Sequence, residues 1–337
     1  LTRSTSPFFD KEYREKTKIT LPVTKGVIGL PRGISKGQNV LNLLFELFDS
    51  TENEEDFSKL PIPFFCIATD VETGGEVILE KGSLPLALRA SGSFPTLLNP
   101  VVFEDKLLVD GGVANNFPVS ILKSKGMDIV IGVDVEGQLF EKDKLNSVVD
   151  IMNQVVSYQM YRKSGKEKEK LDVYIHPKIQ EYNVVDFDKK LKIIEKGNEE
   201  AQKFSDIFKE LAAKQTKKRK RKKITFNTKK YVVSEVDILG SNNYTRAFIL
   251  GKIKIRVGDS LSRNEITKRV HLLSSTKNYE RIEYNLTKKK DNTYKLKMIL
   301  KESNDNANLR LGVHYDHLYK SGVLLNYNHK HVLQEND

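Results

Sequence analysis

Only one cysteine, Cys66, occurs in the 337 residues, so an internal disulfide is excluded. No run of about 18 apolar residues is present, which excludes a transmembrane helix but not membrane β-strands, whose alternating pattern is weaker. The chain starts at Leu1 without a basic segment and an apolar stretch, so we see no signal peptide and expect that both ends are cut. Histidine is also scarce, since none of the six precedes His176. A Ser-His-Asp triad in the first half of the chain would therefore have to borrow that residue.

Positive charge is what the sequence has in excess. Lysine and arginine number 56 against 45 acidic residues, which gives a net charge of +11 and a pI of about 9.3. This balance favours anionic partners, either phosphate head groups or nucleic acid. Seven consecutive cations occupy residues 217–223, in the segment KKRKRKK. We interpret residues 216–229 first as a solvated linker; contact with an anionic membrane and a nucleic-acid patch are the alternatives.

Residues 61–214 alternate between apolar runs typical of buried strands and segments typical of helices. The runs IPFFCIATDV and MDIVIGVDV predict strands, and residues 145–163 and 188–214 predict long helices. Strands that alternate with helices imply an α/β fold, with a mainly parallel sheet and helices on both faces. The segment VVFEDKLLVDGG instead predicts a hairpin that turns at Glu104 and Asp105.

A different pattern follows the basic segment. Residues 230–302 predict the order β-α-α-β-β, with a capping box formed by Ser262 and Glu265 and a hairpin around residues 290–292. These elements would make a small α+β domain. In residues 303–337, two segments alternate apolar and polar side chains and predict a C-terminal β-hairpin. This hairpin suits the start of an outer-membrane β-barrel, but an ordinary amphipathic hairpin fits the pattern equally well.

The segment KLLVDGGVANNFP, residues 106–118, places a carboxylate at the end of a predicted buried strand. α/β enzymes place catalytic groups at such strand ends. We expect Gly111 and Gly112 to adopt positive φ and to let a partner approach Asp110 closely, while Asn115 and Asn116 cap the next helix or hold the turn. An Asp-Gly turn that merely leaves the strand is the alternative. As a base, Asp110 would need a dry site, because its unperturbed pKa of about 3.9 is low.

Other residues suggest weaker sites. Cys66 lies in an apolar run and is interpreted as a buried small hydrophobe, not as a nucleophile. Asp70 also ends a predicted strand; with Asp110 it would form the carboxylate pair of a glycosidase, although a turn-forming role is the simpler interpretation. Asp134 could imitate a ribose-binding acid, but no G-x-G-x-x-G precedes it. We expect Arg89 to form a salt bridge on a helix surface.

Four segments occur in an order and spacing typical of one enzyme family: IPFFCIATDVETGG, LALRASGSFPTLLNPV, KLLVDGGVANNFPV and MDIVIGVDV. Together they resemble the second half of a bacterial patatin-like phospholipase, a serine acyl hydrolase with a Ser–Asp dyad. The resemblance implies that Asp110 is the acid of the dyad and that Gly111 and Gly112 complete its motif. In that family a Gly-rich oxyanion loop and a G-x-S-x-G nucleophile elbow precede the region that aligns with residue 1, so we expect neither in this chain. Ser91 and Ser93 lie in a different motif and are not expected to be the nucleophile.

Residues 230–302 resemble a polypeptide-transport-associated (POTRA) domain, both in element order and in the phrase VDILGSNNYTRAFIL. A patatin-like domain, then a POTRA domain and then barrel strands resemble the patatin-type autotransporters of Gram-negative bacteria. The resemblance implies a partial acyl hydrolase domain (1–215), the basic linker (216–229), the POTRA-like domain (230–302) and the start of a β-barrel (303–337). It also implies an outer-membrane or cell-surface location, with the POTRA-like domain in the periplasm.

The predicted function is therefore lipolytic: a serine attacks the carbonyl of a phospholipid or other lipid ester, and Asp110 acts as the base. No cofactor and no metal is implied, and nucleic acid is not expected as a partner. Because the serine and the oxyanion donors are expected outside this chain, the chain alone should be inactive. The alternative is a non-catalytic secretion or assembly module of the outer membrane, whose POTRA-like domain binds extended polypeptide by strand addition.

Overall fold

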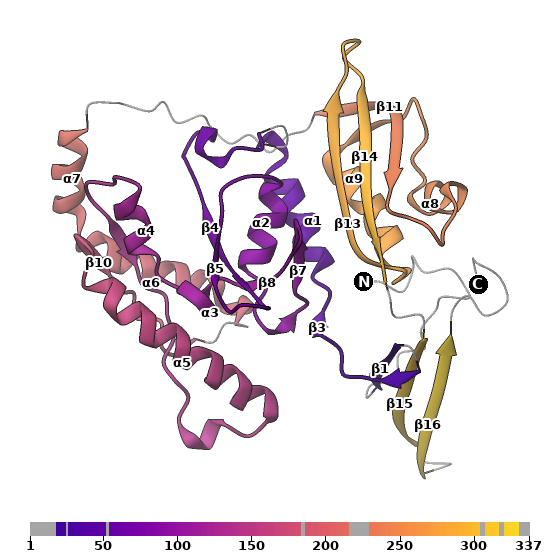
Figure 1. Cartoon of the computed structure of the whole chain (residues 1–337), viewed down its shortest axis with the longest axis horizontal. Coiled ribbons are helices and arrows are strands. Elements are labelled where there is room, and N and C mark those ends of the chain that lie inside the picture. Colours follow the sequence, from indigo (N-terminus) through magenta and orange to yellow (C-terminus); the bar gives the residue numbers. More distant parts are fainter. Residues whose placement is uncertain are drawn as a thin grey trace.

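A computed structural model of the chain describes residues 18–24, 26–51, 54–182, 186–215, 229–303, 307–316 and 320–329 (Figure 1). Helices and strands alternate up to residue 215, and a β-rich part with two helices follows. The α/β class predicted from the sequence is confirmed, and so is the C-terminal hairpin. The seven-cation run and most of the predicted linker lie outside the described residues, so the linker stays a prediction.

The sheet that carries Asp110 has four strands in the order β5–β4–β8–β7. Their bounds are Glu76–Leu79, Cys66–Asp70, Lys106–Asp110 and Val101–Phe103. All three pairings are antiparallel, so the predicted parallel arrangement does not hold in this sheet. Short connections account for two of the pairings, β4 with β5 and β7 with β8, because a tight turn such as the one at Glu104 and Asp105 can join only antiparallel neighbours. In the described part before residue 216, parallel pairing occurs in two smaller sheets, β3 (Gly33–Ser35) with β6 (Thr96–Leu98) and β9 (Ile131–Val133) with β10 (Val173–Ile175).

Seven α-helices accompany these strands in the described part before residue 216. Their bounds are α1 Gln38–Leu47, α2 Leu84–Ser91, α3 Gly112–Asn115, α4 Val119–Ser124, α5 Val148–Lys168, α6 Lys190–Gln202 and α7 Ser205–Lys214. Short 3-10 turns lie at Asp49–Thr51, Phe57–Lys59, Lys142–Lys144 and Phe187–Lys189. The long helix predicted over 188–214 is two helices, α6 and α7, and no side chain caps the start of the second. Within the described ranges, no helix combines the length and the apolar character needed to cross a membrane.

Residues 230–302 form a second four-stranded sheet, in the order β12–β11–β14–β13, with two helices. The bounds are β11 Lys230–Leu239, α8 Arg246–Ile253, β12 Ser260–Ser262, α9 Arg263–Ser274, β13 Tyr279–Lys288 and β14 Tyr294–Glu302. The predicted order β-α-α-β-β is confirmed, apart from the short extra strand β12. The predicted capping box is confirmed as well, since the Ser262 N–H donates to Glu265 Oε2 at 2.8 Å and the Ser262 hydroxyl accepts from the Glu265 N–H.

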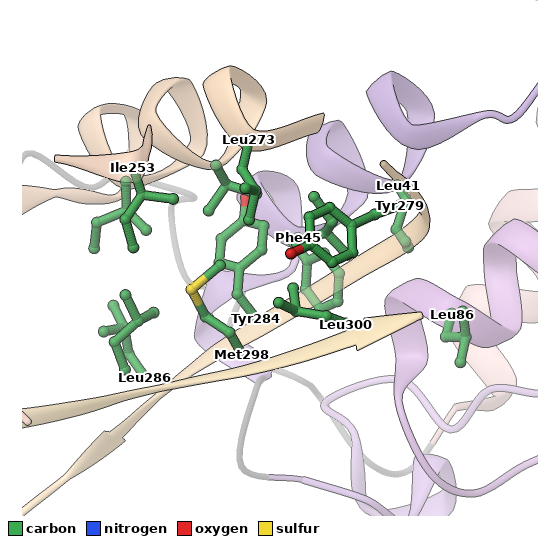
Figure 2. Packing of buried hydrophobic residues seen from close by; sticks show 14 of the residues in the cluster. Leu41, Phe45, Leu86, Ile253, Leu273, Tyr279, Tyr284, Leu286, Met298 and Leu300 are labelled. Carbon is green, nitrogen blue, oxygen red and sulfur yellow. The ribbon is translucent and has the colours of Figure 1, made fainter. Parts of the chain in front are cut away.

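Helix α1 joins the two parts of the chain in one hydrophobic core. Its Leu41 and Phe45 are buried, and the centroid of the Phe45 ring lies 4.9 Å from that of Tyr284 in β13 (Figure 2). Next to α1, Arg263 of α9 pairs with Asp49, with 3.2 Å between Nε and Oδ1, and both side chains are largely buried. The domain boundaries predicted from the sequence stay predictions, but the apolar residues on both sides of residue 230 pack into a continuous core.

A third four-stranded sheet combines the first and last strands of the described chain, in the order β16–β15–β1–β2. Their bounds are Lys320–His329, Ala307–Asp316, Lys18–Thr24 and Val27–Ile28. The strands β15 and β16 form the predicted hairpin, and β1 pairs with β15 so that Leu21 lies opposite Leu309. Along β16, Val323, Leu325 and Tyr327 are 83%, 66% and 59% exposed. The predicted alternation thus places large apolar side chains on an exposed strand face.

Candidate active site

Asp110 lies at the end of β8, where the strand turns into the short helix α3. Its backbone is fixed on both sides: the N–H donates to Ser93 O at 3.0 Å, and the carbonyl accepts from Thr69 Oγ1 at 2.8 Å. Its carboxylate Oδ1 accepts from the Gly112 N–H at 2.8 Å. From the residues that the structure describes, no hydrogen bond reaches Oδ2. One carboxylate oxygen therefore orients the group, and the other is available.

The half-buried position of Asp110 changes its acidity. Burial raises the pKa of Asp110 above its usual range, because the surrounding protein disfavours the charged form. The hydrogen bond from the Gly112 N–H opposes this rise, since it stabilises the carboxylate. A raised pKa makes this group a better base than a solvent-exposed carboxylate. The direction of this pKa shift is the one that the predicted role as a base requires.

Gly111 and Gly112 are needed for close packing and not for an unusual backbone conformation. Gly111 has a φ of −64° and leads directly into α3, and neither glycine has positive φ, so that prediction is wrong. A Cβ atom on Gly111 would lie 2.0 Å from the carbonyl oxygen of Ile67 in β4. One on Gly112 would lie 2.4 Å from Cε of Met160 in α5. The predicted close approach occurs, but the approaching groups are the protein's own strand and helix.

The two asparagines that follow Asp110 hold the turn in place. Asn115 Nδ2 donates to Glu76 Oε2 in β5 at 2.8 Å, and Asn116 Nδ2 donates to Glu136 Oε1 at 2.7 Å. Of the two roles considered from the sequence, capping and turn formation, the structure supports the second. The segment after the carboxylate is thereby fixed to the sheet on one side and to the chain beyond β9 on the other.

Glu136 belongs to a buried polar cluster that the sequence analysis missed. Lys168 Nζ lies 2.6 Å from Asp134 Oδ2 and 2.7 Å from Glu136 Oε2, and Tyr174 donates to Asp134 at 2.5 Å. Burial alone would raise the pKa of Asp134, but the hydrogen bonds from Lys168 and Tyr174 hold it below its usual range. Asp134 thus serves this cluster, and nothing here supports the ribose-binding alternative. The sequence feature that could have indicated this cluster is the segment VDVE, in which two acids, one residue apart, follow an apolar strand.

The other carboxylate and histidine candidates do not join Asp110. His176 Nδ1 lies 3.4 Å from Asp134 Oδ2, and no hydrogen bond connects it to Asp110 in the described part of the chain. The Asp70 carboxylate closes its own turn, accepting from the Glu72 N–H at 3.1 Å. The turn-forming interpretation of Asp70 is the one that its contacts support. Among the described residues, no group of three or more His, Cys, Asp and Glu side chains is arranged to hold a metal ion.

Arg89 and Ser93 form a buried pair behind Asp110. Arg89 is 4% exposed, so the predicted surface salt bridge is wrong. Its guanidinium donates to the carbonyl oxygens of Lys36 and Asn99, each at 3.1 Å. It also donates to the Ser93 hydroxyl. Burial lowers the pKa of Arg89 to about 10. The fully buried Ser93 hydroxyl donates to the Arg89 carbonyl at 2.6 Å, so it is structural. The carbonyl of Ser91 accepts from the Gly111 N–H at 3.2 Å.

The letter pattern G-x-S-x-G does occur in this chain, at residues 33–37, and the sequence analysis overlooked it. The predicted absence of the nucleophile elbow itself stays a prediction. Ser35 ends β3, and α1 begins three residues later. Its hydroxyl accepts from the Gly37 N–H at 3.1 Å, and the positive φ of this turn, 74°, falls on Gly37. In a nucleophile elbow, by contrast, the serine itself occupies the strained turn. No hydrogen bond joins Ser35 to Asp110 among the described residues, so the structure does not bring these two groups together.

Residues 7–123 match the family model for patatin-like phospholipases. This part of the chain is patatin-like. The match includes Asp110, Gly111 and Gly112 and all four strands of the sheet that carries them. Residues 294–337 match the model for the OMP85 superfamily. The matched segment begins at the start of β14 and extends through the C-terminal hairpin.

Curated relatives agree with the patatin-like match. An uncharacterized NTE family protein of Mycobacterium tuberculosis is 37% identical over 102 residues, which are 30% of this chain and 17% of that protein. A protein of Meyerozyma guilliermondii named Lysophospholipase NTE1 is 33% identical over 136 residues, 40% of this chain and 8% of that protein. A second uncharacterized NTE family protein, from Mycobacterium bovis, is 30% identical over 105 residues, 31% of this chain and 28% of its own length. The chain thus spans between 8% and 28% of the length of these three relatives.

Proposed function

We propose that this chain supplies the acid of a Ser–Asp dyad in a lipolytic acyl hydrolase, with Asp110 as that acid. The observation that carries the proposal is the state of the Asp110 carboxyl group. Oδ1 is held by the Gly112 N–H at 2.8 Å, no hydrogen bond from the described residues occupies Oδ2, and burial raises the pKa. A fixed and partly desolvated carboxylate with one available oxygen is suited to accept the proton of a serine hydroxyl.

The reaction would proceed in two stages. The serine oxygen attacks the carbonyl carbon of a phospholipid or other lipid ester while Asp110 takes the hydroxyl proton. Asp110 then gives this proton to the alcohol oxygen that leaves from the tetrahedral intermediate, which restores the carboxylate. Water then hydrolyses the acyl-enzyme, with Asp110 again acting as the base. We place the serine and the oxyanion donors in a segment that precedes residue 1, so the 337-residue chain by itself should not hydrolyse esters. The relative named as a lysophospholipase supports a lipid ester as the substrate.

The C-terminal part supports an outer-membrane location for the parent protein. The OMP85 superfamily match covers residues 294–337, and the hairpin within it exposes Val323, Leu325 and Tyr327 on one strand. We propose that residues 303–337 begin a membrane β-barrel and that residues 230–302 form a periplasmic POTRA-like domain. The observed β-α-α-β-β order supports the second assignment.

Binding of an extended polypeptide is the weaker candidate function. Strand addition needs an available sheet edge. The edge strand β13 is engaged at Ile282 by the side chain of Gln38, and the opposite edge strand, β12, has only three residues. These features favour the hydrolase as the principal function.

The test replaces Asp110 by Asn in the full-length protein and measures release of fatty acid from phospholipid and lysophospholipid. We expect a loss of at least about 10²-fold, the usual minimum for removing a general base. Ser35→Ala is the matched control, because it removes the serine of the other G-x-S-x-G spacing, and it should leave hydrolysis unchanged. Hydrolysis that survives Asp110→Asn would overturn the role of Asp110. A loss caused by Ser35→Ala alone would instead overturn the placement of the nucleophile before residue 1.

A further inference from the structure

A hollow of about 830 Å³ lies in the β-α-α-β-β part, between the end of α8, the segment before β12 and helix α9. Ten residues line it, among them Arg246, Leu250, Lys254, Arg256, Val257 and Arg269. None of them belongs to the Asp110 site. The hollow is therefore a separate feature of the molecule, and its size suits a small ligand or a lipid head group.

Positive charge dominates the lining. Four of the ten residues are cations, and the single acid, Asp259, is already paired with Arg269, with 3.1 Å between Oδ2 and Nη1. Arg246 also has a structural contact, since its Nη2 donates to the Val236 carbonyl at 2.6 Å. The side chains of Lys254 and Arg256 are exposed, and in the described part of the chain they make no hydrogen bond or ion pair. Two cations thus remain available to bind an anion at this hollow.

Apolar surface lies beside these cations. Val257 is 68% exposed and directly follows Arg256, Leu250 is half-buried, and Ile255, which is 2% exposed, also lines the hollow. An inorganic anion would use the cations and leave this apolar surface in water. A molecule with a phosphate next to hydrocarbon would use both kinds of surface at once.

We infer that this hollow binds the phosphate of an anionic phospholipid, with Lys254 and Arg256 as the phosphate ligands and Val257 against the hydrocarbon beyond it. The lining contains no aromatic side chain, which disfavours single-stranded nucleic acid because its bases bind by stacking on aromatic rings. The site would hold this part of the protein against a membrane surface. The inference does not depend on the proposed catalytic role of Asp110.

The experiment measures binding of the 337-residue chain to sedimented vesicles of phosphatidylcholine, with or without phosphatidylglycerol. The test variant carries Lys254→Glu and Arg256→Glu. The control variant carries Lys288→Glu and Lys290→Glu, which change two other exposed lysines and give the same net charge. Since each Lys or Arg near an anionic surface strengthens binding about fivefold, we expect the test variant to bind the phosphatidylglycerol vesicles at least about 25-fold more weakly. The control variant should lose much less, and circular dichroism should show both variants folded.

Equal losses in the two variants would overturn the site, because they would show that only the overall charge matters. A second arm titrates inorganic phosphate into the wild-type chain by calorimetry. The lipid would be overturned as the ligand, and a free-phosphate site would remain, if phosphate binds saturably and as strongly as the vesicles do and if the test variant loses this binding. Weak or absent phosphate binding together with the selective vesicle loss supports the phospholipid. A third arm adds single-stranded oligonucleotide, and displacement of the chain from vesicles through Lys254 and Arg256 would overturn the choice of lipid over nucleic acid.

Discussion

The side-chain amide of Gln38 pairs with the backbone of Ile282 in both directions. The Ile282 N–H donates to Gln38 Oε1 at 2.9 Å, and Gln38 Nε2 donates to the Ile282 carbonyl at 2.8 Å. This is the pattern that a neighbouring strand would form with β13. An amide at the start of α1 thus satisfies one residue of the sheet edge in the β-α-α-β-β part, and it does so across 244 positions of sequence.

Replacing Gln38 by Ala should destabilise the whole chain. Ile282 is fully buried, so its N–H and carbonyl would lose their partners without access to water, at a cost of about 1–3 kcal/mol in the free energy of unfolding. Gln202→Ala is the control, because that exposed side chain makes no hydrogen bond in the described part of the chain, and it should change stability by less than about 0.5 kcal/mol. Urea denaturation of both variants provides the measurement. Equal stabilities would mean that the Gln38 pairing contributes nothing.

The ion pair between Asp49 and Arg263 should contribute more to the stability of the chain than the Gln38 pairing does. Its side chains are only 11% and 4% exposed, and Asp49 Oδ2 also accepts from the Tyr231 hydroxyl at 2.6 Å. Asp49→Ala would remove one partner of a buried ion pair, which typically costs about 3–5 kcal/mol. Asp206→Ala breaks the exposed pair with Lys209 and should cost less than about 1 kcal/mol. Thermal unfolding of the two variants compares them, and similar shifts in Tm would contradict a buried interface.

Gly111→Ala should both destabilise the chain and displace Asp110. The added Cβ would lie 2.0 Å from the Ile67 carbonyl oxygen, which is backbone and cannot move without disturbing β4, and overpacking of this kind costs about 1–3 kcal/mol. Gly165→Ala is the opposite case, since nothing lies within 4 Å of its Cβ position in α5. That change should stabilise the helix by up to about 1 kcal/mol. Chemical denaturation should therefore give effects of opposite sign, and the same sign would contradict the packing at β4.

Asp110→Asn should raise stability at neutral pH while it abolishes hydrolysis in the full-length protein. The folded pKa of Asp110 is raised, so this group contributes stability below its unfolded pKa of 3.8, and the contribution is lost as pH rises through the folded pKa. Asparagine has no charge to bury, and its Oδ1 can still accept from the Gly112 N–H. The Tm difference between variant and wild type should therefore grow as pH rises from below 3.8 to neutral. A variant less stable than wild type at neutral pH would contradict the raised pKa.

The thiol of Cys66 should be nearly inert at neutral pH. Burial raises the pKa of Cys66 to about 11, although a hydrogen bond with Ser91 opposes the rise. Because only the thiolate reacts, alkylation by iodoacetamide should be at least about 10²-fold slower than for a free cysteine, and its rate should rise about tenfold per pH unit until the pKa is approached. The same chain unfolded in urea is the control and should react at the rate of a free cysteine. Fast alkylation of the folded chain would show that Cys66 is accessible.

Features that depend on neighbouring residues were predictable from the sequence. The hairpin turn at Glu104 and Asp105 was predicted because the turn residues interrupt two apolar runs, and the Ser262–Glu265 capping box because both partners lie within one helical turn. The strand that ends in Asp110 was predictable for the same reason. The catalytic role of Asp110 came from the resemblance of its motif and remains a proposal.

The sequence by itself determined local features such as the turn at Glu104 and Asp105 and the Ser262–Glu265 capping box, because turn and capping chemistry act over a few residues. Only the tertiary structure decided the antiparallel order of the Asp110 sheet, the burial of Arg89 and the pairing of Gln38 with Ile282. These features depend on which distant segments pack together. That choice reflects the total of buried area and satisfied hydrogen bonds over the whole chain, and no local pattern records it.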